Sequence, residues 1–359
     1  MLTRVLLAVA EQFLFPFQGA AWNQSYMALC GNDTALMAIH YGYSKIGNAG
    51  GQFLVSPVVA GLADRFGRVF FATAGRAGWF VFWMILGQPW MSLRGRMMAE
   101  WFCWSISGGV WPVHAAQHSD VFGSRPLLSS QVKTADQVYC QAAAFLANIA
   151  GPLMLVRYGV QTVFYASSVL VVILSAVSAT MPETLAKKDR KPFRMARSNV
   201  LGNIYQLLTN GPGLRKLTLS STVWFFCNST NATRNSYAMG VLEWSPTNLS
   251  HFSSIFSLSG AASQKFIIRP FLAAFGNRRT FEVGALISAL SYLLQAHAWR
   301  GGSRAVSAMM FTAFSVLLQT IPAGMPAAMR SMMVAQVAHK RQHSMLGFHV
   351  SIGKLPDKF

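Results

Sequence analysis

"VVAGLADRFGRV", residues 58–69, places an acid, two arginines and a glycine between two long apolar runs. Its distinctive residues are Asp64, Arg65, Gly67 and Arg68. A glycine can adopt backbone conformations that other residues cannot, and a tight turn between helices needs such a conformation. An aspartate at a helix end can pair with an arginine and with the N-terminus of the next helix. The stretch therefore predicts a tight, charged turn between two helices.

The composition of the chain is that of a membrane protein. Of its 359 residues, 53% are hydrophobic and 11% are charged, whereas a soluble domain carries about 25% charged residues. Because so few charges could not cover a water-facing surface, we expect an all-α, polytopic membrane helix bundle. The four cysteines show no metal-ligand spacing, and a disulfide between Cys30 and Cys227 is not favoured.

Ten segments are apolar enough to form membrane-spanning helices. They cover residues 5–22, 46–63, 69–91, 97–115, 138–156, 160–181, 217–232, 252–275, 281–299 and 305–328. We expect the first to be retained rather than cleaved as a secretory signal, because Glu11 and Gln12 interrupt it. The predicted domains are an N-terminal six-helix half (1–181), a cytoplasmic basic linker (182–216), a partial C-terminal half of four helices (217–328) and a polar tail (329–359).

The basic residues follow the positive-inside rule. The net charge is +19, and segments on the side of the N-terminus hold 20 of the 30 Lys and Arg. Three more lie within predicted helices, at Arg76, Lys265 and Arg269. The seven on the external side are Lys45, Arg94, Arg96, Arg157, Arg234, Arg300 and Arg304. We therefore expect a multi-pass protein with both termini cytoplasmic and the linker beside lipid headgroups, and no nucleic-acid partner.

Glycosylation motifs give a second test of this topology. The N-x-S/T triplets begin at Asn23, Asn32, Asn228, Asn231 and Asn248. Asn23, Asn32 and Asn248 fall in predicted external loops and are the candidates for modification. None of the five triplets falls in a predicted cytoplasmic segment, so the two patterns agree.

The turn that opened the analysis, together with six helices, a basic linker and further helices, resembles the major facilitator superfamily. The family signature between its second and third helices runs roughly G-x-L-a-D-R-x-G-R-[KR]. Here Leu62 to Arg68 match in register, whereas Ala60 and Val69 replace the first glycine and the last basic residue. "MPETL" (181–185) is a second family-like feature, and "PFLAAFGNRR" (270–279) resembles a second-half copy of the turn without its acid.

The resemblance implies a transporter of a small solute that works by alternating access, with two halves rocking around a central site. It also implies that Asp64, Arg65, Gly67 and Arg68 act as a gating latch. The chain has no GxxxxGK[ST] motif, so facilitated or ion-coupled transport is expected, with no enzymatic activity and no cofactor. "NIAGP" (148–152) resembles a helix-five motif of family antiporters in its glycine–proline pair, which favours export.

Polar residues inside the membrane are expensive and often functional. Six of them are candidates for binding protons or substrate: Glu11, Glu100, Gln264, Lys265, Asn228 and Gln319. Glu100 alternatively reaches water or pairs with Arg96 four residues earlier. Lys265 needs a cavity or a carboxylate partner, whereas we expect Arg76 and Arg269 to extend toward the membrane surface. For the amides, contact between helices is the alternative role.

Two further patterns bear on function. "HAAQHSD" (114–120) has His114 and His118 on one helix face, but no third ligand cluster accompanies them, and no metal site is expected. The family has twelve helices in its usual form, against the ten predicted here. A transport-incompetent relative, acting as an interaction or regulatory membrane protein or without function of its own, is therefore the alternative to a transporter.

Overall fold

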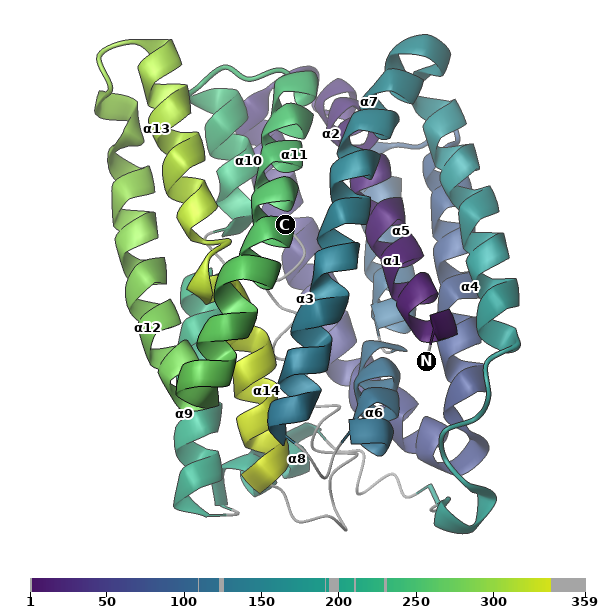
Figure 1. Cartoon of the computed structure of the whole chain (residues 1–359). Helices are drawn as coiled ribbons and strands as arrows, with labels where there is room; N and C mark the ends of the chain where they lie inside the picture. The colour runs from purple at the N-terminus through teal and green to yellow at the C-terminus, as the bar shows by residue number, and fades with distance from the viewer. Residues whose placement is uncertain are drawn as a thin grey trace. The chain divides into compact units, whose positions relative to one another are not determined.

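The computed structural model describes residues 2–108, 110–122, 126–190, 192–193, 200–209, 211–228 and 231–336. These residues are predominantly helical and contain no β-strand (Figure 1). The expected all-α fold is therefore confirmed.

Two compact units divide the chain. Unit 1 comprises Met1–Ala35, Arg125–Val163 and Thr233–Met332, and unit 2 comprises Leu36–Ser124, Phe164–Ala232 and Met333–Phe359. Each unit thus takes segments from both halves that the sequence predicts. The division of the chain at 182–216 stays a prediction.

Unit 1 begins with two consecutive helices, α1 and α2, which are separated at Gln18. The helical elements of unit 1 are α1 (Leu2–Phe17), α2 (Gly19–Leu29), the first part of α7 (Pro126–Ala179), α10 (Asn231–Gly240), α11 (Pro246–Ser263), the π-helix η3 (Gln264–Ile268), α12 (Arg269–His297), the 3₁₀ turns η4 (Ala298–Arg300) and η5 (Ile321–Gly324), α13 (Arg304–Leu317) and α14 (Met325–Gln336). α7 lies close to the end of α1, because a Cβ atom added to Gly151 would lie 1.8 Å from the Phe17 carbonyl oxygen.

Unit 2 holds the turn that the sequence singles out. Its helices are α3 (Thr34–Phe66), α4 (Arg68–Leu86), α5 (Leu93–Gly108), α6 (Val110–Phe122), the second part of α7, the 3₁₀ turn η1 (Lys187–Asp189), α8 (Val200–Thr209) and α9 (Pro212–Asn228). α8 lies inside the predicted linker, which is therefore partly helical. α4 packs closely on α5, and a Cβ on Gly78 would lie 2.6 Å from the Ser107 hydroxyl. Small residues allow this close approach, as in other membrane bundles.

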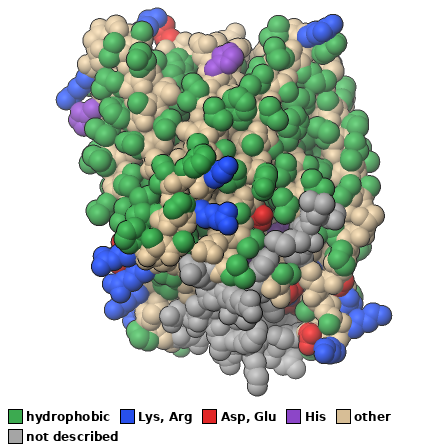
Figure 2. Space-filling model, in the orientation of Figure 1, with side chains coloured by type: hydrophobic (Ala, Val, Ile, Leu, Met, Phe, Trp, Pro, Cys, Tyr) green, Lys and Arg blue, Asp and Glu red, His purple; other side chains and the backbone are tan. Residues whose placement is uncertain are grey.

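Each of the ten predicted segments overlaps one helix or a run of two or three consecutive helical elements. Within the described residues, five stretches are long and apolar enough to cross a membrane: Val5–Leu29, Thr34–Phe66, Arg68–Leu86, Ser130–Ala179 and Arg304–Met333. On the face shown in Figure 2, hydrophobic side chains cover the middle and most Lys and Arg lie toward the two ends. This distribution is that of a helix bundle in a bilayer.

Three glycines with positive φ make the sharpest turns between helices. Gly67 joins α3 to α4 at φ 107° and ψ 156°, while Gly159 and Gly276 break α7 and α12 at φ 82° and φ 73°. These conformations are essentially restricted to glycine. The backbone predicted for Gly67 is therefore confirmed, and Gly276, in the second-half copy of the turn, adopts a similar one.

Several helices begin earlier than the sequence analysis expected, among them α3 and α11. α3 starts at Thr34, where the Asp33 carboxylate accepts the Ala35 N–H at 2.8 Å, and α11 starts at Pro246, capped by the Ser245 hydroxyl. Both are ordinary N-cap arrangements. The placement of Asn23 in a loop is wrong, since it lies within α2, and Asn248 lies in the first turn of α11. Asn32 does lie in an exposed turn.

Candidate gating site

The turn around Gly67 is closed by its own backbone and by a distant acid. The Gly67 N–H donates to the Ala63 carbonyl at 3.0 Å, which ends α3, and α4 begins at the next residue. A Cβ at position 67 would lie 2.5 Å from Oε2 of Glu183. Glycine is therefore needed here twice, for its backbone conformation and for the approach of Glu183.

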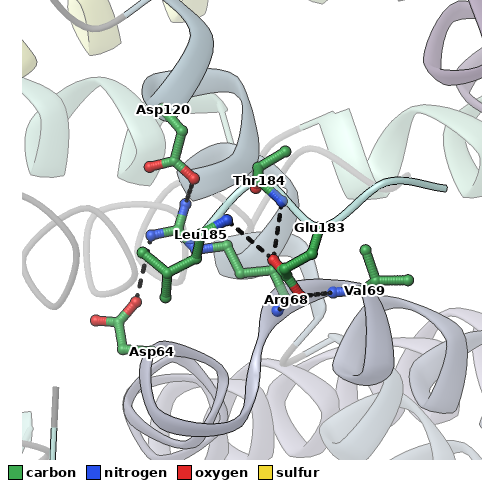
Figure 3. A network of polar contacts seen from close by, with 7 residues as sticks. All are labelled: Asp64, Arg68, Val69, Asp120, Glu183, Thr184 and Leu185. Atoms are coloured by element: carbon green, nitrogen blue, oxygen red, sulfur yellow. Dashed lines mark hydrogen bonds and ion pairs between the residues drawn. The ribbon is translucent and has the colours of Figure 1, made fainter. Parts of the chain in front are cut away.

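Glu183, from the "MPETL" stretch that follows α7, caps the N-terminus of α4. Its Oε2 accepts the N–H of Arg68 at 2.8 Å and of Val69 at 3.2 Å. Its Oε1 accepts the N–H of Thr184 at 2.9 Å and of Leu185 at 3.1 Å (Figure 3). A carboxylate at this position satisfies N–H groups that the helix leaves free and complements the helix dipole. The two family-like motifs of the sequence thus meet.

Arg68 is the centre of an ionic network between helices. Its side chain is 0% exposed and lies between Asp64 of α3, at 3.4 Å, and Asp120 of α6, with which it also forms an ion pair (Figure 3). Breaking a buried pair by removing one partner leaves an uncompensated charge and is strongly destabilising. We refer to Asp64, Arg68, Asp120 and Glu183 as the gating network.

Asp64 pairs with an arginine as expected, since its Oδ1 lies 3.4 Å from Nη2 of Arg68, and Glu183 occupies the N-terminus of α4. The two arginines also differ. Arg68 is buried, whereas Arg65 is exposed and lies over the Phe66 ring at 4.9 Å. Arg65 is therefore outside the network, and only one of the two arginines holds the helices together.

A second polar layer lies two turns further along α4. The prediction that Arg76 extends to the membrane surface is wrong, since its side chain is 1% exposed. Its Nη1 donates to the Ser178 hydroxyl at 2.6 Å and to the Ala72 carbonyl at 3.1 Å, and its Nη2 lies 3.4 Å from Nε2 of His114. Arg76 thus links α4, α6 and α7, and two of these helices, α4 and α6, also belong to the gating network.

Comparisons with known proteins place this arrangement in a fold. No protein-family model matches the chain. It is 24% identical over 322 residues to the class C tetracycline resistance protein of Escherichia coli, which covers 87% of this chain and 75% of that protein. The crystal structure of the human organic anion transporter MFSD10 matches with a TM-score of 0.69 and 16% identity, covering 99% of this chain and 90% of that chain.

The proton:xylose symporter XylE matches with a TM-score of 0.69 and 11% identity, covering 98% of this chain and 85% of that chain. The chain has the major facilitator fold. The resemblance drawn from the turn and the helix pattern is confirmed, and the chain is a multi-pass integral membrane protein. The proteins that it matches are transporters, not enzymes.

Among the six polar residues that the sequence singles out, Glu100 is fully buried. It is 0% exposed, its Oε2 accepts a hydrogen bond from the Ser44 hydroxyl, and its Oε1 lies 3.4 Å from Nε of Arg96. Lys45 interacts electrostatically with the same carboxylate. The alternative in which Glu100 reaches water is wrong, and pairing with Arg96 is confirmed. Arg96 and Lys45, which the sequence analysis counted with the external charges, lie within α5 and α3.

Glu11, Gln264 and Gln319 are buried in unit 1. Glu11 lies on α1 within electrostatic reach of Cys140 on α7. Oε1 of Gln319 lies 2.8 Å from the position of a Cβ on Gly260, which the Gln141 side chain also approaches. Oε1 of Gln264 is buried without a hydrogen-bond partner among the described residues, at the start of the π-helix η3. Such π-helical turns are frequent at functional sites.

Lys265, the next residue, is exposed on the same π-helix and lies over the Phe266 ring at 5.1 Å. No carboxylate of the described residues pairs with it, so the expected acidic partner is not found. The side chain of Asn228 lies outside the described residues. The roles of these residues in binding protons or substrate stay predictions.

The remaining candidates belong to other contacts. His114 faces Arg76 and Asp120 pairs with Arg68, and the described residues contain no cluster of His, Cys, Asp and Glu that could hold a metal ion. Cys30 is a buried free thiol. The sequence analysis missed the roles of Glu183 and Asp120 in the network. Each was visible as an acid at the end of an apolar segment, but only the fold shows the arginine they share.

Proposed function

We propose that this chain carries a small solute across a membrane by alternating access, as a facilitated or ion-coupled transporter. The fold supports transport in general. The names of the similar proteins point to different substrates. One is a tetracycline resistance protein, and the others are transporters of organic anions, xylose and nucleosides. Their names therefore give no single substrate that could be carried over to this chain.

The observation that carries the proposal is the position of Arg68. A buried guanidinium with two acids from two other helices holds α3, α4 and α6 at one end. A conformational change that separates these helices must break charged contacts and expose them to water, and the reverse change restores them. Interfaces of this kind have two discrete arrangements rather than a continuum. The gating network is therefore suited to stabilise one state of an alternating-access cycle.

Ion coupling needs a group that binds the ion inside the membrane. Glu11 is a buried carboxylate on the first helix, and acids inside membrane-spanning segments often mark ion or proton pathways. Glu100 is already engaged with Ser44, Arg96 and Lys45. We therefore propose that protons, where they drive transport, bind at Glu11, and that Glu100 has a structural role.

The test is transport by the full chain in reconstituted vesicles, with and without a proton gradient. Labelled tetracycline, xylose, a nucleoside and an aromatic carboxylate form the panel of solutes. We expect flux of at least one solute above that of empty vesicles. Arg68→Gln should reduce this flux strongly, because it leaves two acids without their cation.

Arg65→Gln is the matched control, since Arg65 belongs to the same turn but is exposed and outside the network. It should leave flux unchanged at equal protein content. Absence of flux for the whole panel, from protein that is folded and monodisperse, would favour the interaction or regulatory alternative. Equal flux in Arg68→Gln and Arg65→Gln would remove the gating role from the network.

A further inference from the structure

Arg234 is a cation within a helix. The sequence analysis counted it with the external charges, but it lies in the first turn of α10 and is partly buried. Its Nε is fully buried and makes no hydrogen bond. Among the described residues, Arg234 forms neither an ion pair nor a hydrogen bond. It differs in this from Arg68 and Arg96, each of which lies against an acid.

Aromatic rings surround the guanidinium instead. Its central carbon lies 4.4 Å from the centroid of Phe256 and 5.2 Å from that of Phe252, both on α11. Tyr292 of α12 interacts with it electrostatically. Phe252 in turn packs against Phe311 of α13 at 5.8 Å. Figure 1 shows α10, α11 and α13 close together, so Arg234 lies at the edge of an aromatic cluster that joins them.

The two acids that follow Arg234 in the described part of the chain have other cations. Glu243, which follows α10, pairs with Arg304 at 2.5 Å. Glu282 of α12 pairs with Arg278 and Arg279. Burying a charge is costly unless the charge is paired and hydrogen-bonded. Contacts with aromatic faces attract a guanidinium but leave its N–H donors unused.

The N–H donors of the Arg234 guanidinium indicate which kind of ligand could bind there. A guanidinium is planar and presents paired N–H groups that match carboxylate and sulfonate oxygens. The aromatic rings beside it offer apolar surface for the body of the same molecule. We propose that Arg234, with Phe252 and Phe256, binds the anionic group of an organic anion, and that organic anions are the solutes this chain carries. The second part of this inference rests on the proposed transport function.

The competing explanation is a structural one, in which Arg234 only holds α10 against α11. It predicts that replacing Arg234 changes stability without changing the response to any ligand. The experiment therefore measures ligand binding and stability in the same sample. The probes are three naphthalenes of nearly equal shape: 1-naphthoate, neutral 1-naphthamide and the cation 1-naphthylmethylammonium.

The full chain is purified in detergent, and the shift of its melting temperature and the Kd are measured for each probe. We expect 1-naphthoate to stabilise the wild-type chain and the other two probes to have no effect. Arg234→Gln should weaken 1-naphthoate binding by about tenfold or more, because a hydrogen bond to a charged group is lost. Arg300→Gln is the matched control, since Arg300 also lies over an aromatic ring, Trp299, but is exposed.

Two further variants cover the case in which Arg234→Gln does not fold. Arg234→Lys keeps the charge but loses the planar donors, and Phe256→Leu removes the closer ring. Each should weaken 1-naphthoate binding several-fold while the control keeps wild-type affinity. Equal affinity in these variants and the control, equal binding of the neutral probe, or no binding of 1-naphthoate to the wild-type chain would overturn the anion site.

Failure of the transport function gives a different result. If 1-naphthoate binds through Arg234 but no solute of the vesicle panel is moved, the anion site stands and the proposed transport is wrong. If the vesicles move xylose or a nucleoside while 1-naphthoate does not bind, transport stands and the inference about Arg234 is wrong.

Discussion

Replacing Gly67 by alanine tests the gating network through its backbone. The turn requires φ 107° and ψ 156°, a conformation that costs a non-glycine residue about 1–3 kcal/mol. The new Cβ would also lie 2.5 Å from Oε2 of Glu183. The carboxylate can move away only by giving up the N–H groups of Arg68 and Val69, and loss of a helix cap costs about 0.5–2 kcal/mol. Gly67→Ala should therefore destabilise the chain by about 1.5–5 kcal/mol in all.

Gly159→Ala separates the two contributions. Gly159 has φ 82° and ψ 172°, and a Cβ there has no atom within 4 Å. This variant should cost about 1–3 kcal/mol from backbone strain alone. The measurement is unfolding of the purified chain in mixed micelles with increasing denaturing detergent. We expect Gly67→Ala to be less stable than Gly159→Ala by about 0.5–2 kcal/mol.

Replacing Glu183, the acid that the new Cβ would meet, completes a double-mutant cycle with Gly67→Ala. In a chain that carries Glu183→Ala, the cap is already lost, so Gly67→Ala should cost no more than Gly159→Ala does. Two sites in contact are expected to show this non-additivity. If Gly67→Ala is as mild as Gly159→Ala, or if its cost is the same with and without Glu183, the account of the turn given above is wrong.

Three further substitutions test the charged groups. Asp64→Asn should lower flux about tenfold or more at matched abundance in the membrane, because it removes a charged partner of the buried arginine; Arg65→Gln should not, and equal flux in both would refute this. Glu11→Gln should abolish accumulation driven by a proton gradient while sparing exchange, and retained accumulation would transfer the role to Glu100. Arg96→Gln should destabilise the chain by about 3–5 kcal/mol, because it breaks a buried pair. Adding Glu100→Gln should restore most of that loss in the same unfolding assay, and no recovery would show that the pair is not coupled.

The fold followed from the sequence because its signals are local. Hydropathy over about 20 residues identifies a spanning helix without knowledge of its neighbours, and Gly67 marked a turn through its own conformational freedom. The helix starts were missed by up to twelve residues at α3, although Asp33 is an ordinary N-cap. The predicted bounds were set by hydropathy and not by capping residues. The first turns of α3 carry His40 and two tyrosines and are only moderately apolar, so the predicted segment began too late.

The partners of the charged residues could not be predicted in the same way. Arg68 and Glu183 are separated by 115 positions in the chain, and Arg76 and Ser178 by 102. No periodicity connects such residues, so the sequence analysis predicted that the Arg76 side chain extends to water or lipid headgroups. Only the packing of α4 against α6 and α7 gives that arginine a hydroxyl, a carbonyl and an imidazole instead.

The arginines enclosed by the helices have different partners. Arg68 and Arg96 lie against acids, and Arg76 lies against a hydroxyl, a carbonyl and an imidazole. Arg234 lies among aromatic rings and has no acid partner among the described residues. Burial of a charge is costly unless the charge is paired and hydrogen-bonded, and cation–π contacts contribute about 0.5–2 kcal/mol. The rings beside Arg234 leave its N–H donors without hydrogen bonds among the described residues. A bound anion would supply those hydrogen bonds, which is why affinity for 1-naphthoate should be lost with this arginine and not with Arg300.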